Sequence, residues 1–287
     1  MDDEILRADD QFGLALIELK GRIKEHNQIE PFSDILDDEL LVGFLRGKKG
    51  DVAKTVTCLE HYIKMRTVKY KNFTKMYRPS TVKMLDNGVV NLLKHPDPLG
   101  RVILMFQINH WSPSEIPFDE AIATSLFIMD EGIRSYFSAG NEVVAIFDCA
   151  GFCFAQAKTM TPRNMILLLD MFMKNIPSRP KGIHLINHGP LIHNLFRIIS
   201  PLLEKKIRER VHFHPDTDHL HRYIPPHILP YSLNGELSLE DATDLSNISK
   251  VRGNDAFYER LSSQLDNATR HGEKSLKSSS RRGLFQL

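Results

Sequence analysis

Apolar side chains recur at helical spacing through about the first quarter of the chain. One stripe consists of Phe12, Leu16, Leu19 and Ile23, a second occupies residues 37–45, and a third begins after Asp51. Asp51 directly precedes its apolar run, which is the position of a helix N-cap. This pattern predicts a small N-terminal helical domain over residues 1–75.

From about residue 80 the pattern changes to short apolar runs that alternate with amphipathic segments. Strands are expected at 101–108, 143–148, 182–187 and 211–214, and helices at 118–137 and after Thr161-Pro162. Continuously apolar strands between helices are typical of a sheet that helices cover. The fold class predicted for this part is therefore α/β.

The segment 191–203 is the most amphipathic of the expected helices. Its apolar residues form two adjacent stripes, and His193, Asn194 and Arg197 lie opposite them. At ~1.5 Å per residue the helix is about 20 Å long, and Pro201 is expected to bend its end. On pattern alone, a helix packed on the core is the simplest interpretation. The alternative is a helix that covers a pocket mouth or lies in a membrane interface.

A basic run follows at 205–210. Lys206 and Arg210 are four residues apart, which places them on one face if this run is helical. Arg179 and Lys181 precede an expected strand and are predicted to lie nearby. Such side chains can bind a phosphate group, whereas the simpler interpretation is a solvated surface.

Composition adds little to this pattern. The 287 residues are 42% hydrophobic and carry a net charge of +1, so charge as a whole does not select nucleic acid. No run reaches the roughly 20 apolar residues of a membrane-spanning helix. Three cysteines are typical of a reducing compartment. We therefore expect a cytoplasmic protein that associates transiently with endosomal or other membranes.

Enzyme motifs are missing from the sequence. It contains neither the Gly-x-Ser-x-Gly elbow of hydrolases nor the His-Glu-x-x-His motif of zinc proteases. We expect no catalysis, no metal and no cofactor other than a bound lipid. A metal-dependent enzyme that uses His212, His214 and His219 is the remote alternative.

Five segments, taken together and in order, resemble a known family. They are residues 40–48, 97–102, 146–151, 182–187 and 206–212. In this order they resemble the CRAL-TRIO lipid-binding family, above all its tocopherol- and retinaldehyde-binding members, over roughly residues 10–245. The resemblance implies a helical domain at 1–75 and a lipid-binding domain at 76–245. A C-terminal extension follows at 246–287, and its Ser-, Lys- and Arg-rich composition predicts disorder after about residue 265.

The resemblance also implies an enclosed apolar pocket that a helical lid closes. Matching positions place Phe147, Phe154, Leu168, Met171, Phe172 and Ile183 in the pocket wall. The lid residues would be Ile192, Phe196 and Ile199. A cleft that binds phosphatidylinositol bisphosphate would consist of Arg66, Arg179, Lys181, Lys206 and Arg210.

The function that follows is that of a monomeric cytosolic carrier. It would transfer a small hydrophobic ligand, the size of a tocopherol or a retinoid, between membranes. Phosphoinositide binding at the cleft would promote lid opening and release. The alternative is a protein that exchanges or senses phosphatidylinositol or another phospholipid.

Overall fold

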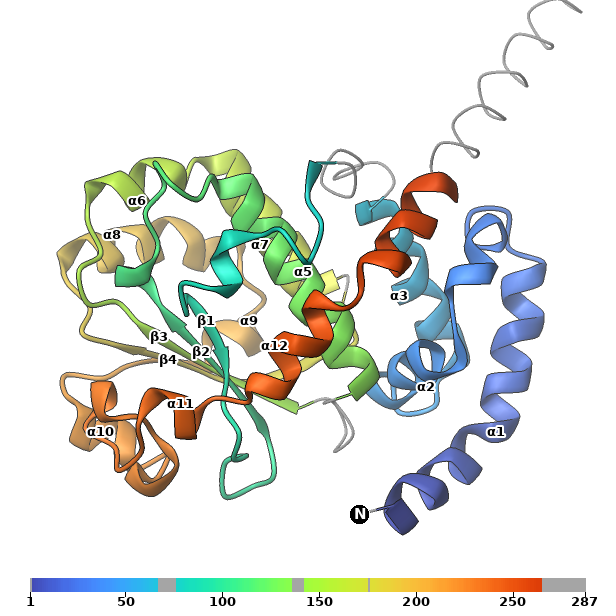
Figure 1. The fold of residues 1–287 in the computed structure, drawn as a ribbon, viewed down its shortest axis with the longest axis horizontal. Helices are drawn as coiled ribbons and strands as arrows, with labels where there is room; N and C mark the ends of the chain where they lie inside the picture. The colour runs from blue at the N-terminus through green and yellow to red at the C-terminus, as the bar shows by residue number, and fades with distance from the viewer. Residues whose placement is uncertain (1, 67–75, 136–141, 175, 265–287) are drawn as a thin grey trace, which may run out of the picture.

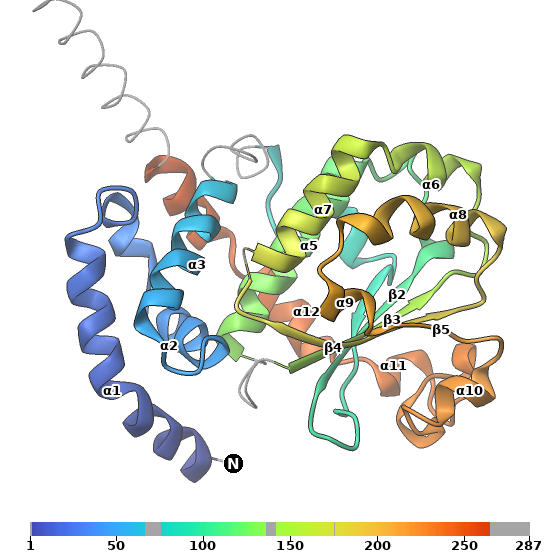
Figure 2. The same cartoon turned by 180° about the vertical axis from the view of Figure 1, so that it is seen from behind.

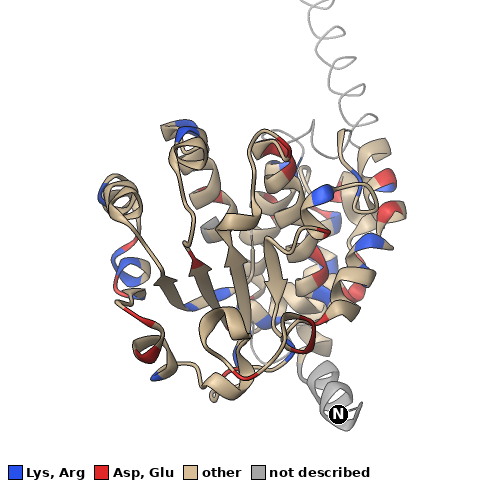
Figure 3. Ribbon diagram, turned by 60° about the vertical axis from the view of Figure 1, so that its left-hand side comes forward, with Lys and Arg blue, Asp and Glu red and all other residues tan. Residues whose placement is uncertain are grey.

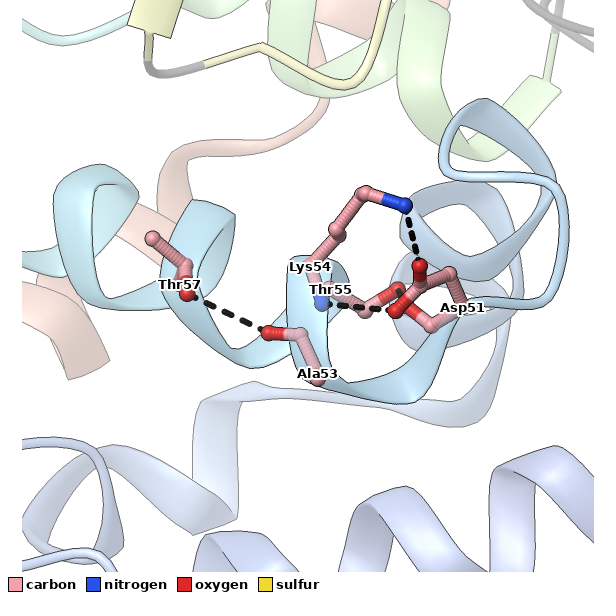
Figure 4. Close-up of polar contacts among 5 residues, drawn as sticks. All are labelled: Asp51, Ala53, Lys54, Thr55 and Thr57. Carbon is pink, nitrogen blue, oxygen red and sulfur yellow. Dashed lines mark hydrogen bonds and ion pairs between the residues drawn. The ribbon is translucent and has the colours of Figure 1, made fainter.

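The computed structural model describes residues 2–66, 76–135, 142–174 and 176–264, which begin with a module of helices. These are α1 (Asp2–Lys24), the 3-10 helix η1 (Glu30–Ile35), α2 (Asp38–Gly47) and α3 (Val52–Lys64), which pack side by side (Figure 1). The Asp51 carboxylate accepts a hydrogen bond of 3.0 Å from the Lys54 amide and so caps α3 (Figure 4). The predicted N-terminal helices are confirmed.

A sheet of five strands forms the centre of the remaining chain. The strands are β1 (Val90–Leu92), β2 (Val102–Gln107), β3 (Glu142–Asp148), β4 (Arg179–Ile186) and β5 (Val211–Phe213). They lie in chain order, β1 antiparallel to β2 and the others parallel. The four predicted strands and the α/β class are confirmed. The sequence pattern did not reveal β1, which has only three residues.

The helices that connect the parallel strands all cover one face of the sheet (Figure 2). They are α5 (Phe118–Ser135), α6 (Phe154–Thr159), α7 (Pro162–Lys174), α8 (Pro190–Ile199) and α9 (Lys205–Arg208). Crossovers between parallel strands are almost always right-handed. Because each successive strand is added on the same side of the last, right-handed crossovers must all pass over the same face.

The opposite face of the sheet is covered by the chain after β5. Ile103, Val144 and Ile146 on this face pack against Leu220, Leu229 and Leu233. The covering elements are α10 (Thr217–His221), α11 (Leu239–Ala242) and the 3-10 helices η7 (Pro226–Ile228) and η8 (Tyr231–Leu233). The other short 3-10 helices are η3 (Lys83–Leu85), η4 (Ile108–His110) and η6 (Ser200–Leu202). This second face is thus close-packed core.

The segment from α12 (Leu245–Arg252) to residue 264 packs against α5 and returns to the helical module (Figure 1). The Asp255 carboxylate accepts a hydrogen bond of 3.0 Å from the Ser80 amide, and the Phe257 side chain is buried. Residues 246–264 are therefore part of the folded core. The tail predicted to be disordered lies outside the described residues, and the domain boundaries stay predictions.

A buried ion pair joins the helical module to α5. The Arg66 guanidinium, just after α3, contacts the Asp130 carboxylate, and the two side chains are 2% and 0% exposed. The Tyr258 hydroxyl donates a hydrogen bond to the same carboxylate. Three parts of the chain that are distant in sequence therefore meet at one buried charge.

We expect Asp130→Asn to destabilise the protein strongly. The substitution leaves the Arg66 guanidinium buried without a counter-charge, which typically lowers the free energy of unfolding by about 3 to 5 kcal/mol. Urea unfolding measures this change.

The matched control is Asp38→Asn, because Asp38 pairs with Lys20 at 2.6 Å on the surface. An exposed pair of this kind contributes at most about 1 kcal/mol. Equal losses in the two variants would contradict a special role for the buried pair.

Candidate functional site: an apolar cavity with a basic edge

A cavity of about 290 Å³ lies between the sheet and the crossover helices. The strands contribute Leu104, Phe106, Val143, Ala145, Phe147, Ile183, Leu185 and Val211 to its wall. The helices and their flanking turns contribute Met129, Leu169, Phe172, Ile176, Phe196, Ile199, Leu203 and Ile207. Among the lining residues Ser178 is the only one with a polar side chain. The cavity is therefore suited to an apolar molecule.

Strand alternation explains which residues reach the cavity. Successive side chains of a strand point to opposite faces, so Leu104 and Phe106 line the cavity while Ile103 and Met105 enter the close-packed face. The rings of Phe106 and Phe147 stack with their centres 4.6 Å apart. Ala145, a small residue between larger neighbours, leaves space in the middle of this wall.

Helix α8 covers the cavity without being buried itself. None of its residues is fully buried, and Ile198 is 56% exposed on the outer side. Phe196 and Ile199 face the cavity. The α-helix ends at Ile199, four residues before the predicted end, and Pro201 lies in the 3-10 helix η6 that follows. Helix α8 is strongly amphipathic and yet has no buried residue because its apolar face lies over the cavity.

One aromatic side chain holds α8 to the sheet. The Phe213 ring lies 4.8 Å from the His193 ring and 5.1 Å from the Phe196 ring, both on α8. His188, in the turn before the helix, packs 5.1 Å from the same ring. Each such ring pair contributes about 0.5 to 1.5 kcal/mol. The contacts between α8 and β5 are thus few and weak compared with a core.

Half of the predicted pocket wall lines the cavity. Phe147, Phe172 and Ile183 do so, and Phe196 and Ile199 are the predicted lid residues that reach it. The strand residues Leu104, Phe106 and Ala145 were missed, although the alternation along 101–108 and 143–148 contains that signal. The lid residue Ile192 is partly buried and does not line the cavity.

The other three wall predictions do not lie at the cavity. Leu168 and Met171 belong to the core that joins α7 to the helical module. Their neighbours Leu169 and Phe172 occupy the face of α7 that looks into the cavity. Phe154 is 64% exposed, with the Lys158 ammonium 5.0 Å from its ring. For Leu168 and Met171 the error is one of helix register, because both faces of α7 are apolar.

Three of the predicted cleft residues lie at the amino ends of β4 and β5, namely Arg179, Lys181 and Arg210, and Lys206 lies on α9 just before β5. Lys181 and Arg179 contact the Glu142 carboxylate at 2.9 and 3.4 Å, and Arg210 donates a hydrogen bond to the Pro180 carbonyl. Charges otherwise lie mainly on the surrounding helices and loops, while the strands carry few (Figure 3). A hydrogen bond from Lys181 and the two positive charges lower the pKa of Glu142, so this carboxyl is ionised at neutral pH.

Two expectations about the cleft require correction. Arg66 is buried in its pair with Asp130 and is not exposed beside the other four residues. Lys206 and Arg210 do not share a helix face, because α9 ends at Arg208. The Arg210 carbonyl instead accepts a hydrogen bond of 2.9 Å from the Ile183 amide, which holds this residue against β4.

The predicted histidine cluster lies on the close-packed face, opposite the cavity. His184 Nδ1 and His214 Nε2 are 2.8 Å apart, His212 stacks on His184, and His219 pairs with Asp216 at 2.6 Å. Within the described ranges no group of three His, Cys, Asp or Glu side chains is arranged to hold a metal ion. The metal-enzyme alternative therefore gains no support from this geometry.

Burial makes two of these histidines sensitive to acid. It lowers the pKa of His184 to about 3 and, with neighbouring histidines, that of His214 to about 4. Unfolded histidines bind protons as the pH falls through about 6.5, while these two stay neutral in the folded state. The free energy of unfolding must therefore fall as the pH drops below about 6.5.

We expect His184→Gln with His214→Gln to weaken this pH dependence. Between about pH 7.5 and about pH 5.5 the free energy of unfolding of the parent should fall by roughly 1 kcal/mol per histidine more than that of the double variant. Urea unfolding at both pH values gives the change in the free energy of unfolding for each protein. A loss of stability that the substitutions cause equally at both pH values does not affect this change. His95→Gln changes an exposed histidine and is the control. If the free energy of unfolding of the double variant depends on pH as strongly as that of the parent, His184 and His214 are not the source of the pH dependence.

Comparison with known proteins gives this geometry a context. The CRAL/TRIO domain family matches residues 86–235, which are 150 of the 287 residues. The alpha-tocopherol transfer protein-like protein of Mus musculus is 30% identical over 205 residues, covering 71% of this chain and 60% of that protein. Clavesin-1 of Rattus norvegicus is also 30% identical over 205 residues, covering 70% and 58%. The chain thus spans about three fifths of the length of these relatives.

A solved structure supports the same fold. The crystal structure of Sfh5 aligns with a TM-score of 0.56 at 13% identity and covers 84% of this chain and 91% of that chain. The resemblance predicted from the five ordered segments is confirmed by these matches. None of the helices in the described part of the chain combines the length and apolarity that crossing a membrane requires.

Proposed function

We propose that this chain, which belongs to the CRAL/TRIO domain family, is a cytosolic carrier of a small hydrophobic ligand. The observation that carries the proposal is the apolar cavity between the sheet and the crossover helices. Burial of apolar surface supplies affinity at about 25 cal/mol per Å². The ligand would be shielded from water during transfer between membranes, and no bond would be made or broken.

The wall of the cavity favours a ligand without a buried charge. Ser178 is the only lining residue with a polar side chain, and it can satisfy one small polar group such as a hydroxyl. An ionised phosphate against this wall would lose its hydration without gaining partners. A molecule of the tocopherol or retinoid kind therefore fits better than a phospholipid, which the alternative of phospholipid exchange requires.

Extraction of the purified protein with organic solvent, followed by mass spectrometry, tests this proposal. We expect a lipid with at most one small polar group, in a constant ratio to protein. A content made up only of phospholipid would reject the leading proposal and favour the exchange function.

We expect Ala145→Phe to abolish most ligand binding. A phenyl ring at this position fills the middle of the cavity, so ligand affinity should fall by at least about tenfold, equivalent to about 1.4 kcal/mol. The extracted ligand per mole of protein measures the loss. Ala53→Phe adds the same ring at an exposed position on α3 and is the matched control. Full ligand content in the cavity variant would contradict the proposed binding site.

We further propose that α8 is the lid and that anionic lipids favour its opening. We call Arg179, Lys181, Lys206 and Arg210 the basic edge. Support for the second proposal is that residues of this edge contact the wall of the cavity. Arg210 contacts Pro180, and both Pro180 and the adjacent Val211 line the cavity. A phosphoinositide headgroup that engages these cations would act on the cavity wall itself. It shifts the lid equilibrium to the extent that it binds the open form more tightly.

We expect Lys206→Ala with Arg210→Ala to weaken binding to phosphatidylcholine vesicles that contain phosphatidylinositol bisphosphate. Loss of two charge-assisted contacts should reduce affinity roughly tenfold, while ligand uptake changes little. Vesicle co-sedimentation and ligand extraction measure the two effects. Lys24→Ala with Lys64→Ala removes two exposed cations from the helical module and is the control. Unchanged vesicle binding would refute a headgroup role for the basic edge.

A further inference from the structure

A carboxylate lies inside the basic edge. Glu142 begins β3, and its position in the parallel register is directly opposite Arg179 on β4. One of its oxygens contacts Lys181 Nζ at 2.9 Å and Arg179 at 3.4 Å. The three side chains are between 25% and 31% exposed, so solvent reaches the group. The two cations are therefore already bridged by an anion that belongs to the chain.

We propose that Glu142 is a built-in competitor for a phosphate group at this edge, so that only a ligand that binds the two cations more strongly than the carboxylate takes its place. This inference rests on the proposed headgroup site and names what that site discriminates. Carboxylate and phosphate oxygens accept the same charge-assisted hydrogen bonds from lysine and arginine. A phosphate oxygen that bridges Arg179 and Lys181 would therefore take the place of the Glu142 carboxylate.

The charges of the competing groups determine which ligand can displace Glu142. A phosphate diester carries one negative charge, the same as Glu142, so exchanging the two gains little. A phosphate monoester carries about −1.5 to −2 at pH 7 and three acceptor oxygens, so it exceeds the carboxylate in both respects. Phosphoinositides with phosphorylated inositol rings, and free inositol phosphates, are the ligands with this chemistry.

The remaining cations supply the attraction that brings such a ligand to the edge. Arg210 donates its hydrogen bond to a neutral carbonyl, which leaves its positive charge uncancelled by that contact. Lys206 lies exposed on α9. Four cations and one carboxylate give the basic edge a net charge of +3. Incoming phosphate is thus attracted by the whole edge and opposed by Glu142 at its centre.

Glu142→Gln tests the proposal, since it keeps the side-chain shape and removes the charge. The probes are phosphatidylcholine vesicles that contain either phosphatidylinositol, a diester, or phosphatidylinositol bisphosphate. We expect affinity for bisphosphate vesicles to rise roughly three- to tenfold, the range that two partly exposed ion pairs allow. Affinity for phosphatidylinositol vesicles should rise by about the same factor from a lower starting value, because the cost of displacing Glu142 does not depend on the ligand.

The control for net charge is Glu209→Gln, because Glu209 lies close in sequence to Arg210 and pairs with Lys205 at 3.9 Å. It removes one negative charge but leaves the contacts of Glu142 with Arg179 and Lys181 in place, and we expect less than about a twofold gain. Lys181→Ala provides a second test. In that background Glu142→Gln should produce a smaller gain, because one of the two contacts is already lost. The thermal midpoint of each variant shows that it is folded.

The outcomes separate this inference from the function on which it rests. If the parent binds bisphosphate vesicles but Glu142→Gln binds them no better, or no better than Glu209→Gln, the competitor role is overturned and the headgroup site stands. If neither the parent nor Glu142→Gln binds either vesicle above phosphatidylcholine alone, both proposals are overturned. Soluble inositol trisphosphate identifies the source. A gain with it shows that the headgroup suffices, whereas a gain with vesicles alone supports the competitor role at a membrane.

Discussion

The order of the strands constrains everything else in this molecule. Because β2 to β5 are parallel and follow one another across the sheet in chain order, each right-handed crossover passes over the same face. Five helices therefore share one side, and residues 217–242 cover the other. The second side packs closely. On the first, the side chains of the helices and the strands leave a cavity between them.

Helices α5 and α7 line the cavity on one face and contact the helical module on another. On α5, Met129 faces the cavity while Asp130 receives the buried Arg66. On α7, Phe172 faces the cavity while Met171 enters the core shared with the module. The rigid side of the binding site is thus fixed by burial and by an ion pair, whereas the α8 side depends on a few ring contacts with Phe213. The α8 wall is thus the more weakly held of the two.

Local pattern predicted the elements well, because helix and strand periodicity depend on near neighbours. It could not place Leu168 and Met171, since both faces of α7 are apolar and only the tertiary arrangement decides which one meets the cavity. Arg66 is the clearest failure. Its partner Asp130 is 64 residues away in the sequence, and no local signal distinguishes a buried arginine from an exposed one. The basic edge was found from the residues, but Glu142 within it was not, because its pairing is a property of the strand register.

The cavity has a consequence for the lifetime of the protein. It is a part of the hydrophobic core that the chain does not fill with its own side chains, so a molecule that occupies it completes the core. Binding to the folded state alone stabilises that state by RT ln(1 + [L]/Kd), about 2.7 kcal/mol when the ligand is at a hundred times its Kd. Empty molecules unfold more often and are exposed to proteolysis more often. The steady-state amount of the protein would then follow the supply of whatever fills the cavity.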